Sequence, residues 1–184
     1  WRKYDLANRL HPFKLKGKPF LQETTMTSAA RTIEARLREL GVELPPAVAP
    51  IANYVPFVRT GSLLVISGQL PLDNGKLPDA FKGKLGKDVF NEAGQQAARL
   101  AAINVLAQAQ VALGDLDRVR RVVRLGGFIN ATPGFTALPA VMNGASDFMV
   151  QVFGDHGRHA RTTVGVCELP LDAAVEIEAM IEFA

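Results

Sequence analysis

The sequence predicts one α+β domain in which two long helices cover one face of a mixed β-sheet. Two long stretches carry apolar residues at helical spacing, and five shorter stretches are rich in β-branched or apolar residues. Their order along the chain is helix, hairpin, helix, strand, helix, strand, strand. With 184 residues, 48% of them hydrophobic, the chain is long enough for one domain with a substantial core.

The first expected element is a short amphipathic helix in SAARTIEARLREL, residues 28–40. Ser28 is a candidate N-cap, and Gly41 follows the helix end. The apolar residues lie at i, i+4 and i+7: Ile33, Leu37 and Leu40. The prolines of ELPPAVAP then end this helix and begin a linker.

A β-hairpin is expected at residues 54–72, because the turn signal RTGS separates two apolar, β-rich runs. Residues 73–87 are rich in Gly, Lys, Asp and Pro and predict a surface loop. A long helix follows at 88–113, capped by Asp88 and ended by Gly114. Its face toward the sheet carries the apolar positions 89, 93, 97, 100, 101, 105 and 111.

The C-terminal half predicts a strand at 118–131, a turn at TPGF and a second long helix at 138–154 with Val141, Phe148 and Val152 at helical spacing. Two strands then close the chain. The last one, VEIEAMIEF, alternates strictly between apolar residues and the set Glu176, Glu178, Met180 and Glu182. This alternation predicts one buried face and one acidic face.

The composition excludes several classes of protein. Residues 1–26 hold six Lys/Arg and two Asp/Glu, so taking 6 from 21 and 2 from 18 leaves 15 basic and 16 acidic residues in 27–184. A nearly neutral domain lacks the clustered basic face that nucleic-acid binding normally needs. No apolar stretch reaches the roughly 18 residues that span a bilayer. A soluble, cytoplasmic protein without a nucleic-acid or membrane partner is expected.

Residues 1–26 carry few periodic apolar positions and are expected to lie outside the domain, which then spans 27–184. No uninterrupted apolar run follows their basic residues, which argues against a signal peptide. Sequence upstream of a start at Met26 is one interpretation of this arm. The remnant of an organellar transit peptide is the other, although the arm contains no serine.

Arg161, near the start of the last strand but one, is the main candidate for ligand binding. The strand period places it on one face with the small residues Thr163, Gly165 and Cys167, which leaves space beside the guanidinium. A planar fork of donors suits a carboxylate ligand. An internal ion pair with a glutamate is the commoner fate of a strand arginine, and the pattern leaves both interpretations open.

The remaining reactive groups are expected to be structural. The single cysteine, Cys167, excludes an intrachain disulfide and is expected to be a small buried apolar residue. His156 and His159 are spaced i, i+3 across a glycine loop and lack a third metal ligand. GQLPLDNGKL lacks the ending of a phosphate loop. No metal and no cofactor are expected.

Three segments, IANYVPFVRTGSLLVISGQLP, FTALPAVMNGASDF and ARTTVGVCELPLDAAVEIEAMIEF, resemble the RidA family, also called YjgF. This family of enamine/imine deaminases includes proteins described as endoribonuclease L-PSP. The resemblance covers roughly residues 51–183. It implies a chorismate-mutase-like fold, a homotrimer, and ligand clefts between neighbouring protomers.

The resemblance also assigns roles to single positions. Arg161 matches the arginine that holds the substrate carboxylate, and Glu176 matches the glutamate that positions the hydrolytic water. Further cleft positions correspond to Tyr54, Ser67 and, with an offset of about one residue, Asn143. Thr163 stands where many members have a cysteine, which marks a divergent subgroup.

The resemblance therefore implies a hydrolase of the 2-iminobutanoate/2-iminopropanoate deaminase type, which converts reactive 2-imino or enamino acids to 2-oxo acids and ammonia. Arg161 would hold the carboxylate, and Glu176 is expected to reach the same gap from the neighbouring strand. Apolar positions on the uncovered sheet face fit burial in a trimer. The alternatives are a non-catalytic module that binds small carboxylates and, with the near-neutral charge against it, an endoribonuclease.

Overall fold

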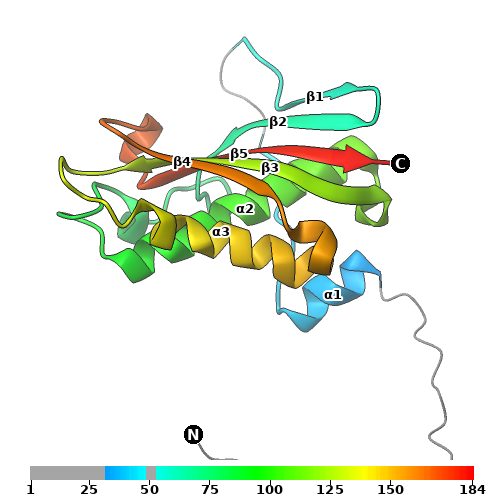
Figure 1. Ribbon diagram of the computed structural model, residues 1–184, viewed down its shortest axis with the longest axis horizontal. Coiled ribbons are helices and arrows are strands. Elements are labelled where there is room, and N and C mark those ends of the chain that lie inside the picture. Colours follow the sequence, from blue (N-terminus) through cyan, green and yellow to red (C-terminus); the bar gives the residue numbers. More distant parts are fainter. Residues whose placement is uncertain (1–31, 49–52) are drawn as a thin grey trace, which may run out of the picture. The chain divides into compact units, whose positions relative to one another are not determined.

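A five-stranded mixed β-sheet is covered on one face by two long helices, α2 (Asn91–Leu113) and α3 (Leu138–Phe153), as Figure 1 shows. The computed structural model describes residues 32–48 and 53–184. Helices on one face of a sheet with parallel and antiparallel neighbours make an α+β fold. The predicted fold class is confirmed.

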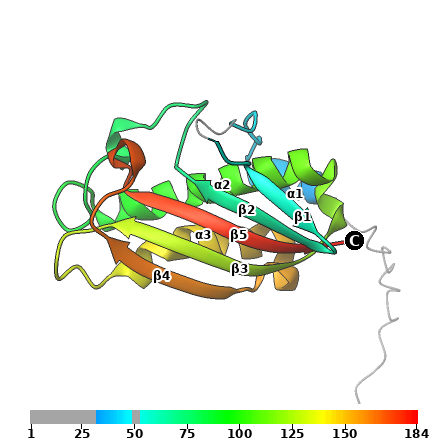
Figure 2. The same ribbon diagram turned by 90° about the horizontal axis from the view of Figure 1, so that it is seen from above.

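The strand order in the sheet is β1-β2-β5-β3-β4 (Figure 2). β1 (Phe57–Thr60) and β2 (Leu63–Gln69) form the predicted hairpin. β5 (Val175–Phe183) is antiparallel to both of its neighbours, β2 and β3 (Val119–Asn130). β4 (Ala160–Val166) is parallel to β3 and forms one edge of the sheet.

β5 alternates between buried and half-buried residues over its whole length, because one of its faces packs on the helices. The half-buried residues include Glu176, Glu178 and Glu182, which lie on the uncovered face. The alternation predicted for VEIEAMIEF is confirmed.

Two adjacent glycines of β3 show which face each strand residue occupies. A Cβ atom on Gly127 would lie 2.4 Å from the sulfur of Met142 on α3, so Gly127 faces the helices. A Cβ atom on Gly126 would lie 2.5 Å from Oε1 of Glu178, so Gly126 belongs to the uncovered face. At each position a neighbouring side chain lies so close to the strand backbone that a residue larger than glycine would not fit unless that side chain moved.

The N-cap of α2 lies two residues after the predicted one. Its N-cap is Phe90, without a side-chain hydrogen bond. The predicted cap, Asp88, is wrong, because its carboxylate accepts a hydrogen bond from the backbone N–H of Lys84 at 3.1 Å and so closes the preceding loop instead. The predicted end is confirmed, since Gly114 takes a left-handed conformation with φ 75°.

The buried face of α2 is wider than its predicted stripe. Val111 was expected to face the sheet but is 62% exposed, whereas Leu106 and Leu113 are buried. α3 packs against α2 in addition to the sheet, and at their contact a Cβ atom on Gly144 would lie 2.0 Å from the carbonyl oxygen of Gln95. Burial from two sides therefore extends the apolar surface around the helix.

A short helix, α1 (Ile33–Glu39), precedes the sheet and buries Leu37. The Thr32 hydroxyl caps it by accepting a hydrogen bond from the backbone N–H of Ala35 at 3.2 Å. The predicted cap Ser28 lies outside the described residues. The expectation that residues 1–26 lie outside the domain also falls there and stays a prediction. None of the described helices combines the length and apolar character that a membrane span needs.

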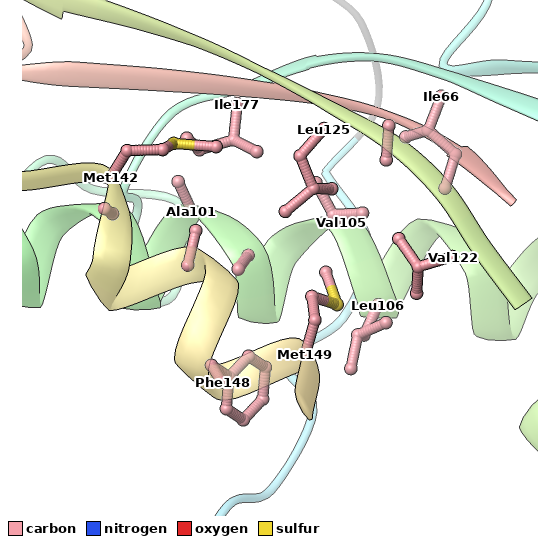
Figure 3. Close-up of a cluster of buried hydrophobic side chains, with 14 of the residues drawn as sticks. Ile66, Ala101, Val105, Leu106, Val122, Leu125, Met142, Phe148, Met149 and Ile177 are labelled. Carbon is pink, nitrogen blue, oxygen red and sulfur yellow. The ribbon is translucent and has the colours of Figure 1, made fainter. Parts of the chain in front are cut away.

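The core lies between the sheet and the two long helices (Figure 3). It contains Met142, Phe148 and Met149 of α3, Ala101, Val105 and Leu106 of α2, and Ile66, Val122, Leu125 and Ile177 of the sheet. Fully burying an aliphatic or aromatic side chain contributes about 1.5–3 kcal/mol. This packing fixes α3 under the edge of the sheet, where two of the residues assigned to ligand binding, Arg161 and Asn143, meet.

Candidate functional site

The guanidinium of Arg161 on β4 is held by two neutral side chains of α3. Its Nη1 donates hydrogen bonds to Oδ1 of Asn143 at 2.9 Å and to Oγ of Ser146 at 3.1 Å. Asn143 and Ser146 are three residues apart, so both lie on the same side of the helix. Arg161 is opposite Leu125 in the β3–β4 register, and the burial of Leu125 beneath the helices confirms that Arg161 faces α3.

Arg161 forms no ion pair with any carboxylate of the described residues. Both of its hydrogen bonds use Nη1, so Nε and Nη2 carry no hydrogen bond from the described part of the chain. Nε and Nη2 form one edge of the guanidinium, with parallel N–H groups that match the two oxygens of a carboxylate. Of the two interpretations left open by the sequence, the internal ion pair with a glutamate is therefore not formed within residues 32–48 and 53–184.

Thr163 lies two residues after Arg161, on the same side of β4. Its hydroxyl oxygen is buried and has no hydrogen-bond partner among the described residues. An unpaired buried hydroxyl costs about 1–3 kcal/mol. Arg161 and Thr163 thus place a cation and an unpaired polar oxygen on the same side of β4.

His159 extends the hydrogen bonding from Ser146. Its Nε2 lies 3.1 Å from Oγ of Ser146, and its Nδ1 lies 2.6 Å from the carbonyl oxygen of Gly157. A carbonyl can only accept, so Nδ1 carries the proton and Nε2 accepts from the serine hydroxyl. Burial lowers the pKa of His159, the hydrogen bond to Gly157 opposes this effect, and the charge of Arg161 adds to it.

Ser146 and His159 are not among the site residues predicted from the sequence, which places His159 in a glycine loop. A signal was present, because Ser146 follows Asn143 at helical spacing and His159 precedes Arg161 by one strand period. We call Arg161, Asn143, Ser146, Thr163 and His159 the arginine group.

Glu176 lies on the uncovered face of the sheet, beside Gly68 of β2. A Cβ atom on Gly68 would lie 1.9 Å from Oε1 of Glu176, so the carboxylate occupies the space that the glycine leaves open. Ser67 precedes this glycine, and its hydroxyl donates to the carbonyl oxygen of Val55 at 2.8 Å. That bond ties β2 to the segment of Tyr54, which is 54% exposed. Glu176, Ser67, Gly68 and Tyr54 are the glutamate group.

Burial raises the pKa of the Glu176 carboxyl, and the charge of Glu178 adds to the effect. Glu178 itself is paired with Arg124 at 2.9 Å, whereas Glu176 has neither a hydrogen bond nor an ion pair within the described residues. A half-buried, unpaired carboxylate with a raised pKa is suited to take a proton from water.

Within one chain, Arg161 and Glu176 do not share a gap, and the prediction that Glu176 reaches Arg161 from the neighbouring strand is wrong. β3 lies between β4 and β5, which places the two strands about 10 Å apart. Glu176 is opposite Phe128, whose neighbour Gly127 faces the helices, so Glu176 and Arg161 are on opposite faces. Each chain thus carries two separate candidate half-sites.

The family of the chain follows from its match to a family model. A family model described as "YjgF/chorismate mutase-like, putative endoribonuclease" matches residues 34–183. The chain belongs to the YjgF family. Its sheet with helices on one face is the fold of that family, and the predicted resemblance is confirmed.

Individual relatives of this YjgF-family chain differ in how much is known of them. Protein TCP17 of Trypanosoma cruzi is 48% identical over 155 residues, which cover 84% of this chain and 96% of the relative. The 2-iminobutanoate/2-iminopropanoate deaminase of Salmonella typhimurium is 30% identical over 137 residues, 73% of this chain and 90% of the relative. A crystal structure of a protein of unknown function from Agrobacterium tumefaciens has a TM-score of 0.77 at 49% identity, covering 83% of this chain and 92% of that one.

The two largest of the cavities described below lie away from Arg161 and Glu176. No metal site is found among the described residues. Cavities of about 750 and 500 Å³ adjoin α1 and the linker after it, and neither is lined by Arg161 or Glu176. Cys167 is exposed, and its predicted burial is wrong, because it follows the end of the edge strand β4. The described part of the chain contains no group of three or more His, Cys, Asp or Glu side chains that could hold a metal ion.

Proposed function

We propose that this YjgF-family protein hydrolyses 2-imino acids and their enamine tautomers to 2-oxo acids and ammonia, in a cleft completed by two protomers of a homotrimer. The observation that carries the proposal is the guanidinium of Arg161, which neutral partners hold at Nη1 while its Nε–Nη2 edge stays open. Such an edge binds a carboxylate with two parallel hydrogen bonds. The name of the Salmonella relative, a deaminase of two short 2-imino acids, supports this choice of substrate class.

The separation of the two half-sites supports a cleft between protomers. A short 2-imino acid cannot contact both Arg161 and Glu176 of one chain, because the sheet lies between them. Arg161 lies on an edge strand, where a second chain can approach. The uncovered face around Glu176 exposes apolar side chains that association would bury, including Val58, Val123 and Val164, which are 51%, 37% and 40% exposed. The arginine group of one protomer and the glutamate group of the next would then form one site.

The chemistry needs an anchored substrate, a placed water and a proton acceptor. Arg161 holds the carboxylate and so fixes the position of the neighbouring imine carbon. Glu176 takes a proton from water as the water oxygen bonds to that carbon, and the C=N electron pair moves to nitrogen, which takes up a proton. The proton that nitrogen takes up is the one that Glu176 took from water, so the carboxylate is free again. The resulting amino alcohol then loses ammonia: Glu176 takes the hydroxyl proton as the C=O bond forms and passes it to the nitrogen as the C–N bond breaks. The products are the 2-oxo acid and ammonia.

An amino-acid oxidase that generates the imino acid in the assay provides the test. The protein should accelerate ammonia release above the rate of spontaneous hydrolysis, and Arg161→Ala should abolish the acceleration at low substrate concentration. Arg38→Ala is the matched control, since this arginine is exposed on α1, far along the chain from both groups. An imine without a carboxylate should not be a substrate.

Two outcomes would overturn the proposal. Binding of a 2-oxo acid that depends on Arg161, without any acceleration of ammonia release, would make the protein a carboxylate-binding module. Cleavage of RNA that survives Arg161→Ala would favour the endoribonuclease in the family description instead.

A further inference from the structure

Four groups near β4 form one directed chain of hydrogen bonds. The imidazole of His159 contacts the Gly157 carbonyl through Nδ1 at 2.6 Å, and its Nε2 contacts the Ser146 hydroxyl at 3.1 Å. The same hydroxyl oxygen accepts from Nη1 of Arg161, also at 3.1 Å. Asn143 provides the second contact to Nη1.

We propose that His159 and Ser146 are positioning residues that hold the guanidinium of Arg161 with its open edge toward the ligand, and that they do so only while His159 is neutral. The inference rests on the proposed function for the identity of the ligand. The coupling between His159 and Arg161 concerns this chain alone and can be measured without a ligand.

The neutral imidazole satisfies every donor and acceptor in the chain. Because Nδ1–H donates to Gly157, Nε2 presents a lone pair, and the Ser146 hydroxyl must donate to it. The lone pairs of the serine oxygen then remain available for the N–H of Arg161. Each hydrogen bond thus fixes the direction of the next, and the guanidinium gains a fixed orientation.

Protonation of His159 reverses the middle of this chain. Nε2 would then donate to the serine oxygen, and two cations would share one hydroxyl. Two contacts of 3.1 Å place Nε2 and Nη1 no more than about 6 Å apart, so their repulsion is substantial. The ligand carboxylate would lie beyond the guanidinium on its open edge, farther from the imidazole. Repulsion of Arg161 therefore outweighs the attraction of the ligand, and acidification should weaken binding.

In the part of the chain that the structure describes, the other charged groups near His159 are paired with each other or make no contact with its ring. Asp155 and Arg158 of the same turn pair with each other at 3.1 Å. The contact from α3 is the neutral Ser146, and Arg161 is the charged group that acts on the imidazole. The lowered pKa of His159 keeps the imidazole neutral at neutral pH.

Binding of pyruvate provides one test, because its carboxylate stays ionised between pH 7.5 and pH 5 on the usual carboxyl scale. Calorimetry in the Glu176→Gln background removes the titration of that carboxylate. We expect the affinity for pyruvate to fall about tenfold between pH 7.5 and pH 5. A tenfold change is what the loss of one strong pairwise interaction produces. His159→Gln, which keeps an acceptor near the Nε2 position but does not titrate, should bind normally at pH 7.5 and show no acid loss. His159→Leu should bind weakly at both pH values.

The serine variants separate positioning from folding. Ser146→Ala should weaken pyruvate binding at pH 7.5 with little change in kcat, and Ser146→Thr should restore it because the hydroxyl returns. Acid weakening that persists in His159→Gln, or affinity that rises on acidification in the parent protein, would overturn the inference.

A measurement without ligand keeps this inference distinct from the proposed function. Nitrogen NMR of the histidine side chains in the full chain should find His159 protonated on Nδ1. Arg161→Ala should raise its pKa toward the ordinary value, because the opposing cation is removed. An unchanged pKa in Arg161→Ala would overturn the coupling even if pyruvate binds and ammonia is released.

Discussion

A guanidinium fixed at one nitrogen presents a rigid edge to its ligand, and Arg161 has this arrangement. Arg161→Lys keeps the charge but loses the planar fork, so we expect KM for 2-imino acids to rise about tenfold or more with little change in kcat. Ammonia release at varied substrate concentration measures both constants. The matched control, Arg38→Lys, should leave them unchanged. Wild-type affinity in Arg161→Lys would reduce the role of Arg161 to a simple positive charge.

In the proposed mechanism the carboxylate of Glu176 acts on water rather than on the substrate carboxylate, so its removal should affect kcat. Glu176→Gln keeps the shape but cannot accept the proton, and kcat should fall roughly 100-fold, while KM changes little. The base works when deprotonated and its pKa is raised, so wild-type kcat should increase as pH rises through a value above 4.5 and then level off. The residual activity of Glu176→Gln should lack this rise. A profile shared by both proteins would show that another group is the base.

Thr163 is not expected to be a nucleophile, because its hydroxyl has no base to activate it. Its oxygen has no hydrogen-bond partner in the described chain, and His159 already accepts from Ser146. Thr163→Val, which has a similar shape, should retain ligand binding and turnover and raise Tm by about 2–4 °C by removing the unpaired hydroxyl. Thermal unfolding and the ammonia assay test both parts. Complete loss of turnover in a folded Thr163→Val protein would assign the hydroxyl a chemical role.

At the level of elements, the packing of β2 against β5 fixes the position of the Glu176 carboxylate. Gly68→Ala would place a Cβ atom 1.9 Å from Oε1 of Glu176, so the carboxylate must move, and kcat should fall about 10-fold to 100-fold. Gly126→Ala is the matched control, because its Cβ would crowd Glu178 at 2.5 Å on the same face. That change disturbs an ion pair worth about 0–1 kcal/mol and should leave kcat nearly unchanged. Equal losses of kcat would indicate a general effect on the uncovered face.

Local pattern was sufficient to predict most elements but not their arrangement. The RTGS hairpin, the end of α2 at Gly114 and the two faces of β5 follow from turn chemistry and periodicity, which a few neighbouring residues determine. The sequence could not show that Asp88 does not cap α2, because the backbone N–H of Lys84 binds its carboxylate only in the folded loop. Exposure of Cys167 likewise depends on the edge position of β4, which is set by the sheet as a whole.

Some residues of the candidate site were predicted from the sequence, but its geometry was not. Arg161 and Asn143 were both assigned, and the structure brings them together. The strand period could place Arg161 and Glu176 on faces of their own strands, but it could not show that β3 separates those strands. Strand order depends on contacts between residues far apart in sequence, so a single-chain cleft could not be excluded from the sequence.

At the level of the whole molecule, a cleft shared by two protomers makes a specific prediction for mixed oligomers. In trimers co-expressed from equal amounts of Arg161→Ala and Glu176→Gln chains, about one quarter of the clefts would combine an intact Arg161 with an intact Glu176 from the next chain. Activity should therefore return to about one quarter of the wild-type value, although each variant alone is nearly inactive. Native mass spectrometry verifies the mixing and should give three times the 19.9 kDa chain mass.

Each result of the mixing experiment has a direct meaning. Verified mixed trimers without recovered activity would show that one chain supplies both residues of each cleft or that the cleft lies elsewhere. A mass of 19.9 kDa at micromolar concentration would contradict the trimer itself.

The free edge of β4 also affects how a separate protomer of the proposed trimer behaves. An unpaired edge strand presents backbone N–H and C=O groups that can template pairing with another chain, and exposed charges on such strands oppose aggregation. Arg161 is the charged residue of β4, so the residue assigned to bind the ligand also protects this edge. Arg161→Ala removes both roles at once and should increase aggregation in dilute or partly dissociated samples. Arg161→Lys retains the charge and keeps the edge protected.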